Sequence, residues 1–379
     1  RAALLAARQR TLRLARAYQA ALGPAACIPY AAEVNPPLWE LGHLAWFQEW
    51  WIARNPQRAL GARADPDAPR PAPLLAQADA WYDSSRVPHR SRWELPLPDG
   101  AGALGYLEAT LSGSVALLDD LPDDAGDDAL YFFRLCAMHE QMHAEAAVYM
   151  ARTLGVPLEE DATPGTAGAP REIDLPAQRF RLGFGGSGFA FDNELGAHDA
   201  DLQAFAIDAE PVTWGAYLPF VRAGGYEDLQ WWSDAGRAWL SGLPRRGPAG
   251  WQAGAPDDAV AVHLTAHEAD AWCRWAGRRL PTEAEWECAA LQGPGFRWGQ
   301  VWEWTASTFW PYPGFTAHPY RDYSQPWFGT RRVLRGASAA TDPAMAHARY
   351  RNFFEPHRRD TLAGFRSVRA DAEPARSVV

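Results

Sequence analysis

The first half of the chain repeats apolar and polar positions with the period of an α-helix. Four stretches show this pattern between breaks rich in Pro and Gly, at about residues 1–22, 35–54, 103–120 and 131–154. Asn35 followed by Pro36 and Pro37 is typical of a helix start, with Asn as the cap and Pro in the first turn. Because four amphipathic helices can bury their apolar stripes against one another, we expect a helical bundle.

The pattern changes in the second half. Residues 156–171 are rich in Pro, Gly, Ala and acids, which is typical of a linker. Beyond them, short apolar runs alternate with Gly, Pro, Asn and Asp, and only two helices are expected, near residues 214–223 and 267–276. The predicted organisation is α plus α+β, with domains at 1–155 and 172–379.

Histidines interrupt two of the apolar helix stripes. His139 and His143 are four residues apart, so on a helix their rings project side by side. His43 lies among Trp39, Phe47 and Trp50 on the stripe of residues 35–54. We hypothesise that the three histidines bind one divalent metal, with Fe(II) preferred, although nitrogen ligands also suit zinc, copper or nickel. The alternative is three core histidines without a metal. Glu140 and Glu145 point off the stripe and are expected to support the site or face solvent.

Composition argues against several classes of function and indicates a cellular location. The net charge of -10 argues against binding nucleic acid or anionic membrane through bulk charge. No run of about twenty apolar residues suggests a membrane span, and the first residues do not form a signal peptide. The 4 cysteines lack paired spacing, which favours a reducing compartment, so we predict a cytoplasmic protein. The sequence leaves the oligomeric state open and is compatible with a monomer.

Several strings together resemble a known enzyme family. They are Asn35 to His43, the element His139-Glu140-Gln141-Met142-His143, Arg279 to Glu287, and Gly299 to Thr305. This chain resembles the ergothioneine-type (EgtB-like) nonheme iron sulfoxide synthases over nearly its whole length. The resemblance implies a DinB-like bundle followed by a formylglycine-generating-enzyme-like domain of C-type lectin architecture. It also implies Fe(II) held by His43, His139 and His143, and an O2-dependent bond between a chalcogen and imidazole C2 of hercynine, followed by oxidation to the sulfoxide.

The resemblance also implies substrate residues in the second domain. Tyr312 lies where the family carries its active-site tyrosine, a proton or hydrogen donor, although a Pro-flanked packing residue is the alternative interpretation. Asn352 and Phe353 resemble residues beside the trimethylammonium group, and Trp302 can add an aromatic face. Arg358 and Phe354 belong to the same closing motif, in which other arginines are expected to form salt bridges.

Departures from the family pattern concern the chalcogen donor. Phe354 replaces an acidic residue, and Met142 replaces the second Gln of the common His-Glu-Gln-Gln-His string. These features resemble the selenoneine synthase branch (SenA), whose donor is a selenosugar. Aromatic and hydroxyl-binding side chains for a sugar are available at Trp81, Tyr82, Asp83, Ser85, Arg86 and Arg90. The alternative donor is a thiol, either cysteine or γ-glutamylcysteine.

Three other classes remain as alternatives. A formylglycine-generating enzyme needs a cysteine pair near the closing motif, whereas Cys273 and Cys288 lie elsewhere and are expected in the core. A lectin-like binding protein would leave the three histidines unexplained. A zinc-dependent thiol transferase of the DinB type would differ in its metal and in needing no O2.

Overall fold

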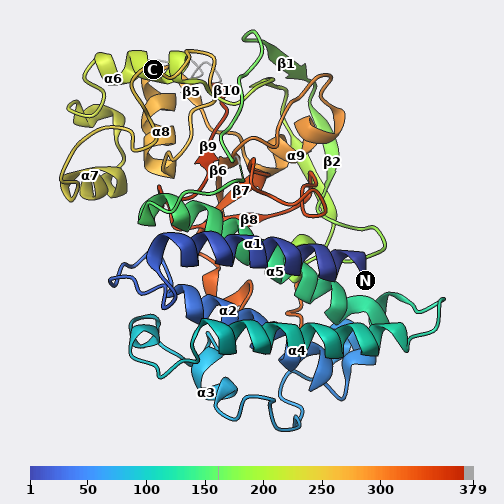
Figure 1. Cartoon of the computed structure of the whole chain (residues 1–379). Coiled ribbons are helices and arrows are strands. Elements are labelled where there is room, and N and C mark those ends of the chain that lie inside the picture. Colours follow the sequence, from blue (N-terminus) through green and yellow to red (C-terminus); the bar gives the residue numbers. More distant parts are fainter. Residues whose placement is uncertain (161, 371–379) are drawn as a thin grey trace. The chain divides into compact units, whose positions relative to one another are not determined.

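The structure, a computed structural model, describes residues 1–160 and 162–370 in two compact units (Figure 1). The helical unit comprises Arg1–Asp161, Gly186–Asp192 and Thr316–Pro326; the mixed unit comprises Ala162–Gly185, Asn193–Phe315 and Trp327–Val379. The first boundary between the two units, at residues 161–162, falls inside the predicted linker of residues 156–171. The sequence-based boundaries treated each domain as one continuous segment, so they missed the two later segments that belong to the helical unit.

The helical unit contains the four predicted long helices. They are α1 (Ala2–Leu22), α2 (Pro37–Gln48), α4 (Gly100–Asp119) and α5 (Asp127–Leu154). Shorter turns of helix connect them, namely η1 (Glu49–Ala53, a π-helix), η2 (Arg58–Arg63), α3 (Ala78–Tyr82) and η3 (His89–Trp93). Helix α1 packs against α5, and α2 packs against α4 and α5. The amphipathic stripes therefore meet in one core, as expected.

Local sequence explains where these helices begin and end. The Asp99 side chain accepts a hydrogen bond from Gly102 N and caps α4. Helix α5 ends at Gly155, whose φ of 68° is accessible to glycine at little cost. Pro37 occupies the first turn of α2, as predicted, but Asn35 does not cap the helix. Its side-chain amide instead donates to Glu40, so that part of the prediction was wrong.

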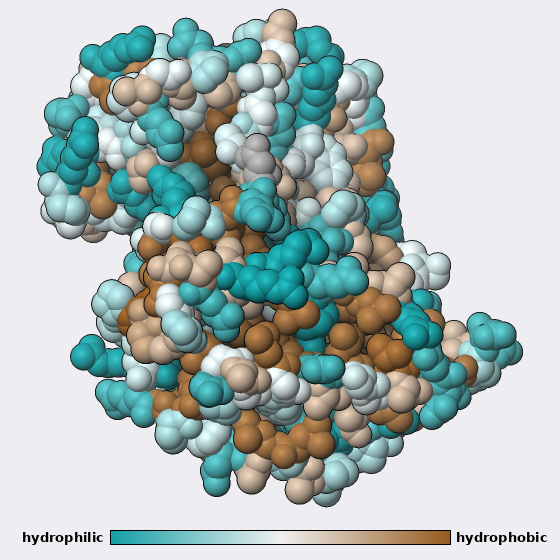
Figure 2. Space-filling view, viewed as in Figure 1, coloured by the Kyte–Doolittle hydropathy of each residue, from teal (hydrophilic) through white to brown (hydrophobic). Residues whose placement is uncertain are grey.

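Among the described residues, α4 alone is long and apolar enough to cross a membrane, judged by length and composition. A core helix of a soluble protein passes the same test, and 28% of the apolar window of α4 is buried, including Tyr106 and Leu107. On the visible face of the helical unit, hydrophobic and hydrophilic residues are interspersed (Figure 2). The predicted cytoplasmic location stays a prediction.

The mixed unit joins short strands to four helices in the part of the chain that the structure describes. Helices α6 (Trp214–Arg222) and α8 (Ala266–Trp275) were predicted, whereas α7 (Asp234–Ser241) and α9 (Glu283–Gln292) were missed. Helix α9 begins with a capping box between Thr282 and Glu285, a pattern that is visible in the sequence. Short 3-10 turns are η4 (Asp192–Glu194), η5 (Leu229–Trp231) and η6 (Gln325–Trp327).

Three small sheets form within the described residues of this unit. The first has the order β1-β4-β10-β5, from Glu172–Leu175, Phe205–Asp208, Val368–Arg369 and Arg278–Arg279. The second pairs β2 (Gln178–Leu182) with β3 (His198–Leu202). The third has the order β8-β7-β6-β9, from Asn352–Phe354, Arg332–Gly336, Trp302–Thr308 and Ala363–Gly364. Only β6 and β9 are parallel among these pairs.

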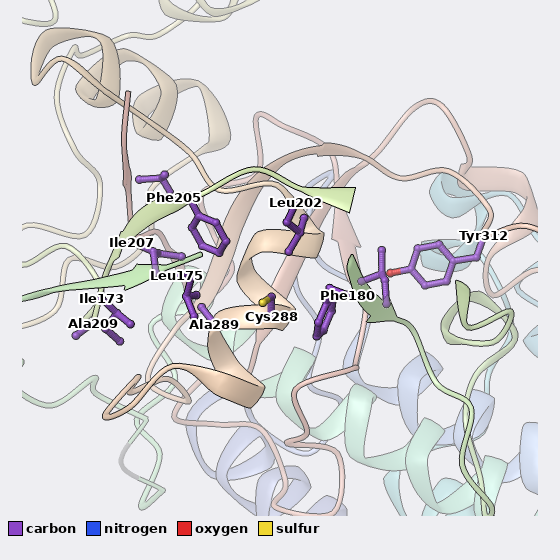
Figure 3. Packing of buried hydrophobic residues seen from close by; sticks show 12 residues of the cluster. Ile173, Leu175, Phe180, Leu202, Phe205, Ile207, Ala209, Cys288, Ala289 and Tyr312 are labelled. Carbon is purple, nitrogen blue, oxygen red and sulfur yellow. The ribbon is translucent and has the colours of Figure 1, made fainter. Parts of the chain in front are cut away.

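Strands β1 to β4 and helix α9 share one hydrophobic cluster. It includes Phe180, Ile207 and Cys288, with Tyr312 at its edge beyond Phe180 (Figure 3). The predicted class, a helical bundle followed by an α+β domain, is confirmed. All four cysteines are free, which agrees with the absence of a disulfide framework in the prediction.

Candidate metal centre

Three histidines from two helices converge inside the helical unit. His43 comes from α2, and His139 and His143 come from α5. Their candidate ligand atoms all lie within 4.8 Å of one another. The ring centroids of His139 and His143 are 4.4 Å apart, and that of His43 lies 5.0 Å from His143. Helical spacing therefore places two ligands on one face, and packing of α2 against α5 adds the third.

Each ring has one nitrogen available for a metal. His43 Nδ1 donates to the carbonyl of Tyr82 at 2.8 Å, and His143 Nδ1 donates to Glu40 at 2.5 Å. These bonds select the tautomer in which Nε2 is a ligand atom. His139 Nε2 is buried and has no hydrogen-bond partner. An orphaned nitrogen beside two oriented imidazoles fits a metal with nitrogen ligands, so this chain's residues suit the implied ion.

Burial favours the neutral form of two of the rings, His43 and His139. Burial, followed by the neighbouring His143, lowers the pKa of His43 to about 3. Burial also lowers the pKa of His139 well below its ordinary value. Burial by itself would raise the pKa of Glu40, but His143, His43 and Asn35 outweigh it and hold that pKa at about 2. A carboxylate beside neutral imidazoles partly balances the charge of a bound cation.

Glu40 is a supporting residue that the sequence interpretation missed. Its two oxygens accept from His143 and from Asn35, both at 2.5 Å. Arg92 in turn donates to Asn35 at 2.8 Å. The signal was available, since Glu40 lies three residues before His43 on the same helix. By contrast, Glu140 forms a buried ion pair with Arg8 at 2.7 Å, so it is not a surface residue.

Aromatic rings enclose the histidines. Phe47 stacks on His139 with centroids 3.5 Å apart, and Trp39 stacks on His43 at 4.9 Å. Tyr320 packs edge-on against His139, with centroids 5.8 Å apart. This tyrosine belongs to the segment Thr316–Pro326, far along the chain from the bundle helices. No periodic signal marks it, because only tertiary packing brings it to the site.

A cavity of about 170 Å³ lies beside these rings in the helical unit. Its aromatic wall is formed by Trp46, Phe47, Trp50, Trp51 and Tyr320. Its polar rim is formed by Asp67, Asp83, Ser84, Ser85, Arg86, Arg321 and Asp322. Since Phe47 and Tyr320 also touch His139, a molecule in this cavity would be close to the histidines.

Sequence prediction placed Asp83, Ser85 and Arg86 at a substrate site, and all three line this cavity. Tyr82 has another role, because its ring is buried against Gly42 and its carbonyl orients His43. Its predicted contact with substrate stays a prediction.

The remaining predicted residues of the helical unit lie elsewhere in it. The Arg90 guanidinium lies 5.1 Å from the ring centroid of Tyr30, at the protein surface. Met142 is half-buried on α5, directly before His143.

Tyr312 is a buried residue of the mixed unit. Its hydroxyl donates to Glu283 at 3.0 Å, and the Arg351 guanidinium lies 3.8 Å from its ring centroid. Burial and then the charge of Glu283 raise the pKa of Tyr312, so the hydroxyl keeps its proton at neutral pH. These contacts match the packing alternative considered for this residue. Its predicted catalytic role stays a prediction.

The closing motif also lies in the mixed unit. Trp302 is buried on β6, and Asn352, Phe353 and Phe354 form β8. Phe353 stacks on Phe309, with centroids 4.1 Å apart. Arg358 pairs with Asp360 at 2.6 Å and lies over the Phe354 ring. Cys273 and Cys288 are buried free thiols, as predicted, and burial raises the pKa of each.

Comparison with known proteins gives consistent matches. The family "Sulfatase-modifying factor enzyme 1-like domain" matches residues 160–300 and 295–371, as expected for the second domain. The hercynine oxygenase of Mycobacterium tuberculosis is 32% identical, with 96% of this chain and 96% of that protein covered. The hercynine oxygenase of Mycolicibacterium smegmatis is 31% identical with the same coverage. The formylglycine-generating enzyme of Streptomyces coelicolor is 30% identical over 47% of this chain and 82% of that protein.

Proposed function

This chain belongs to the hercynine oxygenase family of oxidoreductases, and from that premise we propose that it uses O2 to join hercynine to a sulfur donor at an Fe(II) centre. In this reaction the imidazole C2–H and the donor S–H bonds break, and a C–S bond forms. One oxygen atom of O2 ends in the sulfoxide, and the other leaves as water with the two hydrogens. Hercynine and the donor are small molecules, so the proposal needs no macromolecular partner.

The observation that carries the proposal is the orphaned Nε2 of His139 beside His43 and His143. Fe(II) held by these three residues would supply the electron transfer to O2 and open coordination positions. The carbonyl of Tyr82 and the carboxylate of Glu40 fix two of the rings. Phe47 and Trp39 shield the rings from water, which strengthens local electrostatic interactions.

Tyr320 is our proposed proton or hydrogen donor. It lines the cavity and contacts His139, and burial, followed by Asp322 and Asp83, raises its pKa. Its Oη therefore stays protonated at neutral pH and can donate. Tyr312 remains the donor predicted from sequence. Comparing Tyr320→Phe with Tyr312→Phe separates the two, since loss of sulfoxide in only one variant identifies the donor.

Support for the sulfur branch comes from the extensive match to hercynine oxygenases, so a thiol, cysteine or γ-glutamylcysteine, is the first candidate donor. A selenosugar is the second candidate. The observation that favours it is the cavity of about 170 Å³, where indole faces meet Asp83 and Ser85. Sugars bind well to aromatic faces combined with groups that hydrogen-bond to hydroxyls. Asn352, Phe353 and Trp302 stay predictions for the trimethylammonium group of hercynine.

The test is anaerobic reconstitution with Fe(II), followed by O2, hercynine and one donor at a time, with products identified by mass spectrometry. A sulfoxide formed faster with a thiol than with the selenosugar supports the first candidate. A faster carbon–selenium adduct supports the second candidate. Bound iron without any adduct would overturn both donor assignments, and failure to bind iron would overturn the metal centre.

A further inference from the structure

A second, smaller cavity lies on another side of the metal centre. Its volume is about 50 Å³, and it is lined by residues of α1, α2 and α5 and by Ala26, with part of it open to solvent. It shares no lining residue with the cavity beside Tyr320. His143 and Glu40 form part of its wall, so its contents would touch one candidate ligand directly.

The lining of this cavity is mainly apolar. Its apolar side chains are Leu14, Ala15, Ala26, Leu38, Leu41, Leu44, Ala144, Ala147 and Met150, together with Pro37. Most of them are buried. A cavity needs only roughly 10–15 Å³ on the same measure to hold one water, so this one has room for a small molecule. An apolar lining of this kind favours apolar guests such as xenon.

The polar groups in the wall are largely occupied elsewhere. Both oxygens of Glu40 accept hydrogen bonds, and the Tyr18 hydroxyl donates to Ala147 O at 2.6 Å. The Thr11 hydroxyl is buried without a hydrogen-bond partner, and Gln19 adds a polar side chain to the lining, so a water would be held at these two residues. A water needs two to four polar partners, so an apolar occupant suits the remaining space better.

We propose that this cavity holds O2 and delivers it to the metal centre past His143. The proposal rests on the proposed function, in which O2 is a co-substrate. O2 is apolar and small, and it dissolves better in apolar surroundings than in water. The larger cavity has a polar rim and room for an organic substrate, which would obstruct that approach when bound. A separate apolar site would let O2 reach the centre while the substrates are in place.

The variant Ala15→Leu tests the proposal by filling the cavity from α1, away from the histidines. Ala20→Leu is the matched control, because Ala20 is exposed on the same helix. Crystals of the wild-type protein under xenon pressure should show xenon in the cavity, and Ala15→Leu should lose it. In iron-loaded enzyme, Ala15→Leu should raise KM for O2 several-fold, with KM for hercynine and kcat at saturating O2 unchanged.

The outcomes separate the two proposals. Xenon in the cavity without turnover of any donor would remove the proposed function and the O2 delivery that depends on it, leaving a gas-binding cavity. Normal turnover with no xenon bound, or with a chain of ordered waters in its place, would overturn the O2 site alone. An unchanged KM for O2 in a folded Ala15→Leu variant would do the same. If that variant does not fold, the xenon experiment on the wild-type protein still tests the O2 site.

Discussion

At the scale of single residues, the candidate metal centre depends on which nitrogen each histidine presents. The Tyr82 carbonyl and the Glu40 carboxylate each occupy an Nδ1, so the two Nε2 atoms face inward. His139 Nε2 has no hydrogen-bond partner, and the ring of His139 stacks on Phe47. The three ligands therefore contribute through different supports, and their substitutions should have different effects.

Removing one candidate ligand should greatly reduce metal binding. His139→Ala is expected to lose most of its bound Fe(II), because two imidazoles cannot hold the ion as well as three. The measurement is the ratio of iron to protein after anaerobic reconstitution and gel filtration. His357→Ala is the control, since His357 is exposed in the mixed unit, and it should keep its iron. Full iron content in His139→Ala would contradict the three-histidine centre.

Replacing the carboxylate behind His143 should weaken the centre without destroying it. Glu40 accepts from two donors, His143 and Asn35, whereas an amide offers one oxygen. Glu40→Gln should therefore weaken metal affinity by about 10-fold to 100-fold, as expected when such a partner is removed. Competition with a chelator measures the metal affinity. The exposed Glu33→Gln should match the wild type, and equal affinity in Glu40→Gln would show that the carboxylate is dispensable.

At the scale of elements, helix α2 organises most of the centre. It carries Glu40 and His43, and its Gly42 lets the Tyr82 ring approach the helix backbone. A Cβ added at Gly42 would lie 2.1 Å from Tyr82 Cζ. The helix continues into the π-helix η1, which presents Trp50 and Trp51 to the larger cavity. Irregular turns of this kind are frequent at functional sites.

Gly42→Ala should destabilise the protein, although alanine is the better helix former. The added methyl group would displace Tyr82, whose carbonyl orients His43, so iron affinity should fall together with stability. Gly105→Ala on α4 is the matched control, because its Cβ would meet nothing within 4 Å. That control should gain about 0.5–1 kcal/mol. Urea unfolding measures the stability of both variants, and metal analysis measures their iron content. A gain in stability for Gly42→Ala would refute the close contact.

Periodicity predicted α1, α4 and α5, which each bury one face, and it also predicted α2, which is buried along nearly its whole length. The three histidines were found because they interrupt the apolar stripes of two of these helices. Helix α9 was missed because its start, around Thr282, follows a Pro and its sequence gives only a weak stripe. Glu40 and Tyr320 were missed for another reason, since their roles depend on partners distant in sequence. The sequence therefore predicts which histidines converge on regular elements better than it predicts the residues packed around them.

At the scale of the whole molecule, the helical unit is not built from one continuous segment. The segments Gly186–Asp192 and Thr316–Pro326 belong to it, although both lie beyond the predicted linker. His318 hydrogen-bonds to Tyr131 at 2.9 Å, and Tyr320 packs on Phe47 with centroids 4.9 Å apart. Residues beside the candidate ligands therefore come from segments that are far apart along the chain.

This arrangement predicts that residues 1–161 alone form an incomplete unit. Without Tyr320, one edge of Phe47 and His139 loses its packing, and burial of an aromatic side chain contributes about 2 kcal/mol. The fragment should unfold at lower urea concentration than a second fragment in which residues 316–326 are joined to residue 161 by a Gly/Ser linker. It should also bind more of a dye specific for exposed apolar surface. Since both fragments carry all three histidines, both should bind Fe(II). Equal unfolding midpoints would mean that the later segment adds no stability to the bundle and that any role of Tyr320 is confined to chemistry.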